Sequence, residues 1–409
     1  MDDISVALIS GPIPKDFSNP YYSFVFDEVY RLAKRDLNVH AIRGSAEKDS
    51  FSYGIYFHGL NGSFGIKHFP FILKHLSVVP KTRHLLPPWT LLYLSKYAQT
   101  VAKIIYREKL SLIHAHFAFP EGFVGLLAKK ETGKPLIVTV HGVDVLVEPS
   151  TGYGVRLDKR YDVIVRRVLE EADVVIAASK ATFNEVCNIV KNVQKVQLIP
   201  NGVDTIRFNP NLNFSVLKQK LGLNKQFVVF SLRSHEPKYG LEYLIRSAPT
   251  VLKKKSDVVF IIGGDGSLRQ YHEELAIKLG VREKFIFTGM ISSDELPYYY
   301  ALSDVTVVPS LQEAFGLVVS EAMACGKPVI GSNVGGIPDQ IIDGYTGFLV
   351  EPKDHLKIAE RILWSIDNPE ESKRQGINGR RIVEEKYDIE KRADKIVSLY
   401  KQLLMKEAK

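Results

Sequence analysis

Two carboxylates in the second half of the chain have the spacing of a ligand-binding pair. Glu313 lies in a loop after the apolar run Val305–Val308, and Glu321 follows eight residues later, roughly two turns of a helix that we expect to begin near Phe315. Both carboxylates could then face one ligand, and each could accept two hydrogen bonds from the vicinal hydroxyls of a ribose or hexose. The alternative is that Glu321 is a helix-face residue paired with a lysine.

Two cations follow an earlier strand-like run in the same half. The run Phe227–Leu232 leads into Arg233 and Lys238, which lie five residues apart in a strand-to-helix loop. A guanidinium can hold two oxygens of a diphosphate, and an ammonium adds a point charge. The loop is therefore either a diphosphate site or an ordinary solvated basic loop. Gly264, after the run Val258–Ile262, either lets the backbone approach that ligand closely or only makes a turn.

The first half offers candidate residues near the ends of strand-like runs. Gly11 follows the first run and His141 follows a later one, at positions where ligand-facing loops are expected. His114 and His116 share one face of another run by the strand period of two. A zinc site that combines them with His141 would have no cysteine and few nearby acids to complete it, and the chain has no Asp-x-Asp pair to hold a metal-bound diphosphate. We therefore expect no metal, and His141 is the better candidate for contacting substrate.

Residues 66–109 form a basic segment with interleaved apolar and aromatic side chains. The segment holds eight lysines and arginines against one acid, Glu108, and includes Phe69, Trp89 and Tyr97. That composition suits contact with an anionic membrane surface. It suits equally a helix that packs its apolar face on a sheet and turns its lysines outward.

Length and composition favour a folded chain of two domains. The 409 residues exceed what one core usually carries, and 45% hydrophobic with 24% charged residues is ordinary for a globular protein. No apolar run is long enough to cross a membrane and the start Met1–Asp3 is acidic, so we expect a cytoplasmic protein with peripheral contact to the inner membrane face through 66–109. Two cysteines exclude a disulfide framework, and the net charge of +8 favours phosphate-bearing or anionic partners.

Short β-branched runs alternate with amphipathic stretches almost from end to end. Many runs are apolar throughout, as strands buried on both faces require, and their alternation with helices predicts parallel sheets. We therefore predict an α/β fold of two doubly wound, Rossmann-like domains, 1–202 and 203–386, that face an interdomain cleft. A last helix within 387–409 would cross back to the first domain. The predicted helices are Ser23–Lys34, Tyr161–Glu171, Tyr239–Lys253, Leu268–Leu279, Leu356–Ile366 and Ile389–Leu404.

Five segments together resemble one family of enzymes. They are "VTVHGVD" at 138–144, "LIPNGVDTIRF" at 198–208, "RSHEPK" at 233–238, "GGDGSLR" at 263–269 and "EAFGLVVSEAMACGKPVI" at 313–330. The last segment carries Glu313 and Glu321 in the pattern E-x7-E. In this order the segments resemble the retaining glycosyltransferases of family 4 (glycosyl transferases group 1), which have the two-domain GT-B fold. The resemblance spans nearly the whole chain.

The resemblance implies transfer of a hexosyl group from a UDP- or GDP-sugar to an acceptor hydroxyl, with retained anomeric configuration and without a metal or other cofactor. Domain 203–386 would bind the donor, and domain 1–202 would bind a sugar acceptor or a lipid-linked or cell-surface glycan precursor. Two alternatives remain. One is a GT-B enzyme that epimerises or hydrolyses nucleotide sugars, and the other is a non-catalytic basic protein that binds membrane or nucleic acid. We expect no nucleic-acid partner, because the positive charge is not organised along one repeated face.

The resemblance also assigns four catalytic roles by position. Arg233 and Lys238 would bind the donor diphosphate and stabilise the leaving nucleotide. Glu313 would hold hydroxyls of the donor sugar, and His141 would contact that sugar near the reacting carbon.

Further positions would bind the donor without taking part in the chemistry. Glu321 would hold the ribose hydroxyls, and backbone groups near the helix start would position the sugar. Two positions depart from the family pattern: the first loop reads Gly11-Pro12 where relatives have paired glycines, and Tyr239 stands one residue beyond Lys238 where a glycine is usual. The donor-binding residues implied by the resemblance are Gly11, Gly264, Phe315, Gly316, Leu317 and Glu321.

Overall fold

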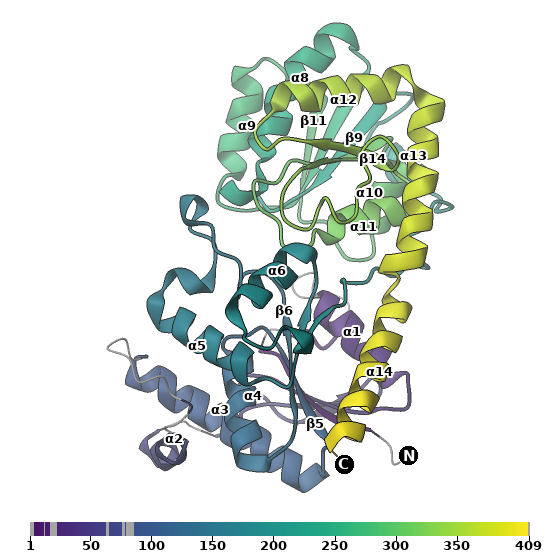
Figure 1. Ribbon diagram of the computed structural model, residues 1–409. Helices are drawn as coiled ribbons and strands as arrows, with labels where there is room; N and C mark the ends of the chain where they lie inside the picture. The colour runs from purple at the N-terminus through teal and green to yellow at the C-terminus, as the bar shows by residue number, and fades with distance from the viewer. Residues whose placement is uncertain are drawn as a thin grey trace. The chain divides into compact units, whose positions relative to one another are not determined.

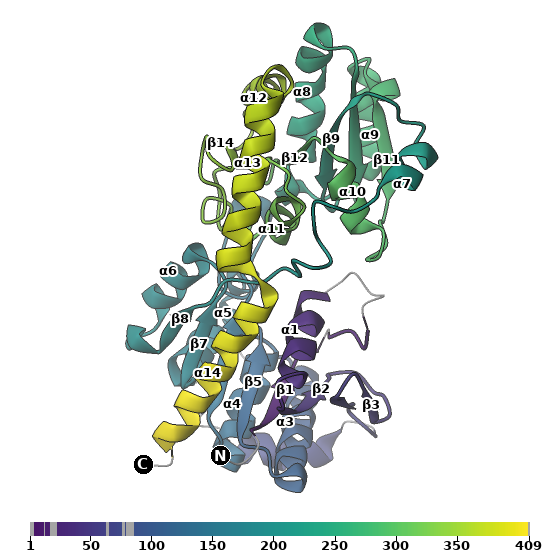
Figure 2. The same ribbon diagram turned by 90° about the vertical axis from the view of Figure 1, so that its right-hand side faces the viewer.

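The computed structural model describes residues 4–11, 13–16, 23–62, 65–75, 78 and 86–407 of the chain. The chain divides into two compact units, one made of Met1–Pro200 with Glu390–Lys409 and the other of Asn201–Ile389. Each unit contains one sheet with helices on both faces (Figures 1 and 2). We call them the N-terminal unit and the C-terminal unit.

The sheet of the N-terminal unit has the strand order β3-β4-β2-β1-β5-β6-β7-β8. Neighbouring strands are parallel except β3 and β4. The central strands are buried on both faces, which is why they read as continuous apolar runs. The strands are β1 (Ser5–Ile9), β2 (Asn38–Ile42), β3 (Ser50–Ser52), β4 (Ile55–His58), β5 (Leu112–His116), β6 (Leu136–Val140), β7 (Val174–Ala177) and β8 (Val196–Leu198).

Helices from both ends of the chain cover this sheet. Helices α1 and α14 lie on one face of the sheet (Figure 2), where their side chains build one core. Side chains of α3, α4, α5 and α6 build the core on the other face. The helices are α1 (Ser23–Ala33), α2 (Phe69–Lys74), α3 (Pro88–Glu108), α4 (Glu121–Thr132), α5 (Lys159–Glu171), α6 (Lys180–Ile189) and α14 (Ile389–Glu407), with short helical turns at Ile66–His68, Pro149–Thr151, Val155–Leu157 and Val193–Lys195.

The sheet of the C-terminal unit has the strand order β11-β10-β9-β12-β13-β14 and is parallel throughout. Helices α8, α9 and α12 build a core on one face, and α7, α10 and α11 build a core on the other. The strands are β9 (Phe227–Leu232), β10 (Val258–Gly263), β11 (Phe285–Gly289), β12 (Val305–Val308), β13 (Val329–Ser332) and β14 (Gly347–Val350). The helices are α7 (Ser215–Lys220), α8 (Leu241–Lys254), α9 (Arg269–Lys278), α10 (Leu296–Leu302), α11 (Leu317–Ala324), α12 (His355–Asp367) and α13 (Pro369–Ile382), with short helical turns at Pro237–Tyr239, Arg282–Lys284 and Val383–Tyr387.

Each sheet is wound in two directions from a central pair of strands. In the N-terminal unit the chain moves outward from β1 and returns to its other side at β5, and in the C-terminal unit it moves outward from β9 and returns at β12. The prediction of two doubly wound α/β domains is therefore confirmed. Ligands of such sheets bind beyond the carboxyl ends of the strands where the direction reverses. The loops after these four strands are the first places in which to look for a site.

Three of the elements that the sequence did not predict, α4, β3 and β14, have weak patterns. Helix α4 contains Gly122 and Gly125, which interrupt its apolar periodicity. A Cβ at Gly125 would lie 2.8 Å from Cδ1 of Leu136, so the glycine permits close packing of α4 on β6. Strand β3 is a short, largely exposed edge strand of Ser50–Ser52, and β14 begins at Gly347.

The basic segment 66–109 packs on the N-terminal sheet through α3. Tyr97, Val101 and Ile105 lie in the core, and the ammonium of Lys96 donates a hydrogen bond to the carbonyl oxygen of Leu60 at 3.3 Å. Residues 76–77 and 79–85 of the segment lie outside the described residues, as does Pro12. Among the helices that the structure describes, none is both long and apolar enough to span a bilayer.

Candidate functional site

A buried guanidinium lies where the C-terminal sheet reverses its direction. Arg233 directly follows β9, and only 6% of this residue is exposed. Its Nη1 lies 2.9 Å from Oε2 of Glu313 in the loop after β12. Its Nε and Nη2 are buried and have no hydrogen-bond acceptor among the described residues. A buried cation with two unused donors is suited to hold two oxygens of an anion.

Glycines let other segments approach Glu313 closely. Gly335, after β13, has a φ of +56°, and a Cβ there would lie 1.6 Å from the carbonyl oxygen of Glu313. The N–H of Gly336 donates to that same oxygen at 3.3 Å. Gly316 has a φ of +88°, and a Cβ there would lie 3.1 Å from Cγ of Glu313. The loop after β13 thus supports the backbone that positions the carboxylate beside Arg233.

Lys238 lies in the short helical turn after β9, and its loop is tied to the loop after β12. The carbonyl oxygen of Lys238 accepts hydrogen bonds from the N–H groups of Leu311 at 2.8 Å and Gln312 at 3.2 Å. The ring centre of Tyr239 lies 5.3 Å from Cζ of Arg233 and 4.8 Å from Nζ of Lys238. The residue that departs from the family pattern therefore lies beside both cations, at cation–π distances.

Gly264 follows β10 and lies against the backbone of Arg233. Its φ is +114°, and a Cβ would lie 2.1 Å from the carbonyl oxygen of Arg233. Close packing of the two loops therefore requires glycine at this position. Its predicted contact with the donor stays a prediction.

Glu321 lies on α11, and a tyrosine hydroxyl lies within hydrogen-bond distance of its carboxylate. The hydroxyl of Tyr300 on α10 donates to Oε2 of Glu321 at 2.7 Å. Tyr300 is fully buried, and this burial raises its pKa well above the usual value for tyrosine. The hydroxyl therefore keeps its proton and remains a donor to the carboxylate.

The start of α11 is held in place by the buried side chain of Gln340. The amide of Gln340 donates to the carbonyl oxygen of Phe315 at 2.5 Å, and its Oε1 accepts a hydrogen bond from the hydroxyl of Ser320. The helix begins at Leu317, two residues after Phe315, because Gly316 adopts a left-handed conformation. Phe315 itself is buried in the core, so only its backbone could contact a ligand.

In the N-terminal unit the loop after β1 meets the start of α4. The N–H of Gly11 donates to Oε1 of Glu121 at 2.9 Å, and a Cβ at Gly11 would lie 2.5 Å from that oxygen. Burial raises the pKa of Glu121 to about 7. The Gly11 backbone therefore contacts a carboxylate of its own unit, and its predicted donor contact stays a prediction.

His141 lies directly after β6 and is oriented by two neighbours. Its backbone N–H donates to Oδ1 of Asp144 at 3.0 Å, and its Nε2 lies 3.0 Å from Nδ1 of His116. The rings of Phe24 and Phe117 flank it. Burial lowers the pKa of His141 well below the usual value, so the imidazole is neutral at physiological pH. Its Nδ1 is buried and has no partner in the described part of the chain.

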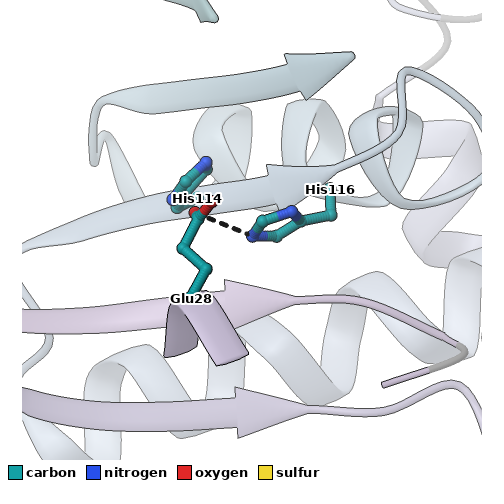
Figure 3. A group of neighbouring side chains, drawn as sticks. All are labelled: Glu28, His114 and His116. Atoms are coloured by element: carbon teal, nitrogen blue, oxygen red, sulfur yellow. Dashed lines mark ion pairs between the residues drawn. The ribbon is translucent and has the colours of Figure 1, made fainter. Parts of the chain in front are cut away.

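Glu28, His114 and His116 form the group in the described residues with the spacing of metal ligands (Figure 3). Their ligand atoms all lie within 4.8 Å of one another. Both ring nitrogens of His114 already lie at hydrogen-bond distance from other groups, at 2.6 Å from the Tyr400 hydroxyl and at 2.7 Å from the Thr139 hydroxyl. The guanidinium of Arg392 lies 2.6 Å from Glu28. These residues do not fit a metal ion, because a cation would compete with Arg392 and break the bonds of His114.

The structure brings together Arg233, Lys238 and Glu313 through loops of the C-terminal unit, and it holds His141 in the N-terminal unit. Sequence reasoning missed Tyr300, Gln340 and Glu121, because their partners lie far away along the chain. Asp144 could have been found, since an aspartate in the loop just after a strand often accepts hydrogen bonds from the backbone of that loop.

Two family models match the chain. The model described as Glycosyltransferase Family 4 matches residues 24–207, and the model described as Glycosyl transferases group 1 matches residues 213–382. N-acetyl-alpha-D-glucosaminyl L-malate synthase of Bacillus anthracis is 30% identical over 78% of this chain and 79% of its own length. The chain belongs to glycosyltransferase family 4. The resemblance identified from the five sequence segments is thereby confirmed.

Other proteins are similar to this family 4 glycosyltransferase. GDP-mannose-dependent alpha-(1-6)-phosphatidylinositol monomannoside mannosyltransferase of Mycolicibacterium smegmatis is 28% identical over 69% of this chain and 74% of its own length. The structure of sucrose-phosphate synthase from Thermosynechococcus elongatus superposes with a TM-score of 0.79, at 24% identity, over 98% of this chain and 99% of that one. HepE of Anabaena in complex with UDP-glucose superposes with a TM-score of 0.74, at 20% identity, over 98% and 100%. The fold is GT-B.

We expect Gly335→Ala to destabilise the C-terminal unit by about 3 kcal/mol or more, because the new Cβ overlaps the Glu313 carbonyl as well as straining the backbone. Transferase turnover should fall with it. Gly344→Ala is the matched control. Gly344 also has a positive φ, +76°, but nothing lies within 4 Å of an added Cβ, so only about 1–2 kcal/mol of backbone strain remains. Urea unfolding measures both, and equal losses would contradict the close approach at Glu313.

Proposed function

We propose that this chain is a retaining glycosyltransferase that moves a hexosyl group from a UDP- or GDP-sugar to an acceptor hydroxyl without a metal ion. The observation that carries the proposal is the buried guanidinium of Arg233, which pairs with Glu313 through Nη1 and has two further donors without an acceptor among the described residues. A nucleotide diphosphate supplies the oxygens that these donors need. Lys238 supplies a second positive charge from the same loop after β9.

Two similar proteins support a nucleotide sugar as the donor. HepE is in complex with UDP-glucose, and the mannosyltransferase of Mycolicibacterium smegmatis is GDP-mannose-dependent. We infer that Glu321, oriented by the Tyr300 hydroxyl, binds the two ribose hydroxyls that UDP- and GDP-sugars share.

The chemistry follows from the charge that develops during transfer. Cleavage of the bond between the sugar and the diphosphate leaves negative charge on the departing phosphate. Fixed cations directed at that charge lower the barrier, because they need no reorganisation as the reaction proceeds. Arg233 and Lys238 can supply this stabilisation themselves, which is the reason for proposing a metal-independent reaction. Glu313 keeps the guanidinium in place and is proposed to hold hydroxyls of the donor sugar.

The N-terminal unit is proposed to bind the acceptor. His141 follows β6, at the edge of the sheet where ligands of parallel sheets bind. Its buried Nδ1 is an unsatisfied polar atom, and such atoms in folded proteins call for an explanation such as a missing ligand. We therefore propose that His141 contacts the donor sugar, and that a hydroxyl near the reacting carbon donates to this Nδ1.

We also propose that the surface of the helical turn Ile66–His68, of α2 and of the start of α3 contacts an anionic membrane, so that a lipid-linked acceptor can reach the enzyme. Large apolar side chains are exposed there, with Ile66 at 84% and Trp89 at 66%. Lys67, Lys74 and Lys103 line a neighbouring cavity of about 420 Å³. Apolar side chains beside cations suit the boundary between lipid headgroups and acyl chains.

We expect Lys238→Ala to lower kcat/KM roughly 10²–10³-fold, because it removes one fixed cation from the leaving phosphate. Arg233→Lys keeps the charge but cannot bind two oxygens at once as the guanidinium does, so kcat/KM should fall at least about tenfold. This variant is preferred to Arg233→Ala, which would leave the largely buried carboxylate of Glu313 without its ion pair. Arg246→Ala, at a half-exposed pair with Glu242 in the same unit, is the control. Unchanged kcat/KM in both site variants would refute the diphosphate assignment.

We expect one of UDP and GDP to raise the melting temperature of the protein, since a ligand that binds only the folded state stabilises it in proportion to its occupancy. Glu321→Ala should lose most of that shift if the carboxylate holds the ribose. Differential scanning fluorimetry with both nucleotides and ADP measures the effect. A shift of equal size in the variant would contradict the ribose contact.

We expect the protein to float with phosphatidylglycerol vesicles at low salt. Lys67→Gln should weaken this binding about fivefold, because one lysine near an anionic surface contributes about 1 kcal/mol. Ile66→Ser should weaken it as well, whereas Ile206→Ser, at an equally exposed isoleucine of the C-terminal unit (84%), should have no effect. Absence of flotation by the unaltered protein would remove the membrane proposal.

A further inference from the structure

A line of buried polar side chains, Arg392, Glu28 and His116, connects the C-terminal helix α14 to His141. Arg392 on α14 contacts Oε2 of Glu28 on α1, with its Nε at 2.7 Å and its Nη2 at 2.6 Å. Oε1 of Glu28 lies 3.6 Å from Nε2 of His116 at the end of β5 (Figure 3). Nδ1 of His116 in turn lies 3.0 Å from Nε2 of His141.

The middle of this line contains two polar atoms that face each other without other partners. Oε1 of Glu28 and Nε2 of His116 are buried, and no described residue gives either of them a hydrogen bond. Only 3% of Glu28 and none of His116 is exposed. A distance of 3.6 Å is longer than a hydrogen bond, but a carboxylate oxygen at this range still decides which ring nitrogen carries the proton. A bare nitrogen facing a buried carboxylate would place two lone pairs against each other, so the proton belongs on Nε2 of His116.

The protonation of His116 then fixes that of His141. With its proton on Nε2, neutral His116 has a lone pair on Nδ1, which can only accept a hydrogen bond. Nε2 of His141 must therefore donate, and Nδ1 of His141 is left as a bare acceptor. Burial lowers the pKa of His116 to about 3, which keeps this ring neutral.

We propose that Glu28 and His116 are positioning residues that hold His141 in the tautomer with its proton on Nε2, so that Nδ1 accepts a hydrogen bond from a sugar hydroxyl. The proposal rests on the proposed function, in which His141 contacts the sugar. Arg392 serves the same arrangement, because it occupies Oε2 of Glu28 and leaves Oε1 to face His116. Helix α14 thereby influences the tautomer of His141, because its Arg392 orients Glu28 of α1.

The variant Glu28→Gln keeps the shape of the side chain but reverses the direction of the hydrogen bonds between residue 28, His116 and His141. Arg392 would hold the amide oxygen, so the amide nitrogen would face His116 and donate to its Nε2. The proton of His116 would move to Nδ1, and His141 would then carry its proton on Nδ1, where a sugar hydroxyl could no longer donate. We expect kcat/KM to fall about 10- to 100-fold, the range seen when groups that orient ligand histidines are removed. The dissociation constant of the nucleotide should not change.

The chain contains a matched control in a similar line elsewhere in the N-terminal unit. Oδ2 of Asp49 lies 2.9 Å from Nδ1 of His58, and Nε2 of His58 lies 2.9 Å from Nδ1 of His40. Asp49→Asn alters a carboxylate–histidine–histidine line of the same kind, but this line does not include His141. It should leave kcat/KM unchanged.

The test combines kinetics with long-range ¹H–¹⁵N spectra of the full-length protein labelled at histidine, in which a bare ring nitrogen is distinguished from a protonated one. We expect His141, identified by the signal lost in His141→Asn, to show a bare Nδ1 in the unaltered protein and a protonated Nδ1 in Glu28→Gln. A protonated Nδ1 in the unaltered protein would overturn the proposal, and this measurement needs no variant of Glu28 to fold. An exchanged tautomer with unchanged kcat/KM would overturn it as well. Absence of transfer by the unaltered protein with every UDP- and GDP-sugar would instead count against the proposed function, and the spectrum would still decide the tautomer.

Discussion

The burial of Arg233 constrains the rest of the C-terminal unit. A guanidinium removed from water is costly unless an opposite charge and hydrogen-bond acceptors surround it, and Glu313 supplies only one ion pair. To make that pair, the loops after β9 and β12 must meet, and glycines at 264 and 335 permit the close backbone contacts involved. Nε and Nη2 of Arg233 have no acceptor among the described residues and are suited to hold an anion, whereas a closed ion pair would leave no donor for a ligand.

The buried polar groups near the strand ends of the N-terminal unit include neutral histidines, in contrast to the buried cation of the C-terminal unit. The histidines at the ends of β5 and β6 are neutral and linked to one another, and their pKa values are lowered because burial penalises the charged form. The last helix completes this polar interior, since α14 supplies Tyr400 to His114 and Arg392 to Glu28. A segment at the end of the sequence is thus part of the first unit's core.

The fold was largely predictable because parallel strands buried on both faces leave a strong apolar signal. Phe227–Leu232 and Val305–Val308 have the predicted bounds. The edge strand at Ser50–Ser52 and the helix at Glu121–Thr132 were not predicted. Edge strands tolerate polar residues, so β3 has no continuous apolar run. In α4, Gly125 permits the close contact with β6, and the glycines interrupt the apolar periodicity of the helix. The basic segment 66–109 could not be assigned for a related reason, since an apolar helix face looks the same whether a sheet or a membrane covers it.

The sequence by itself determined the α/β class, the family, and the loops that carry Arg233, Lys238 and Glu313, because these depend on residue types at short, regular spacings. Only the tertiary structure decided which atoms remain without partners and which tyrosine, glutamine or acid supports each loop. Tyr300 and Glu321 lie on different helices, and Arg392 and Glu28 lie at opposite ends of the chain. Hydrogen bonds and ion pairs act over about 3 Å in space, and a distance along the sequence does not limit them once the sheets have folded.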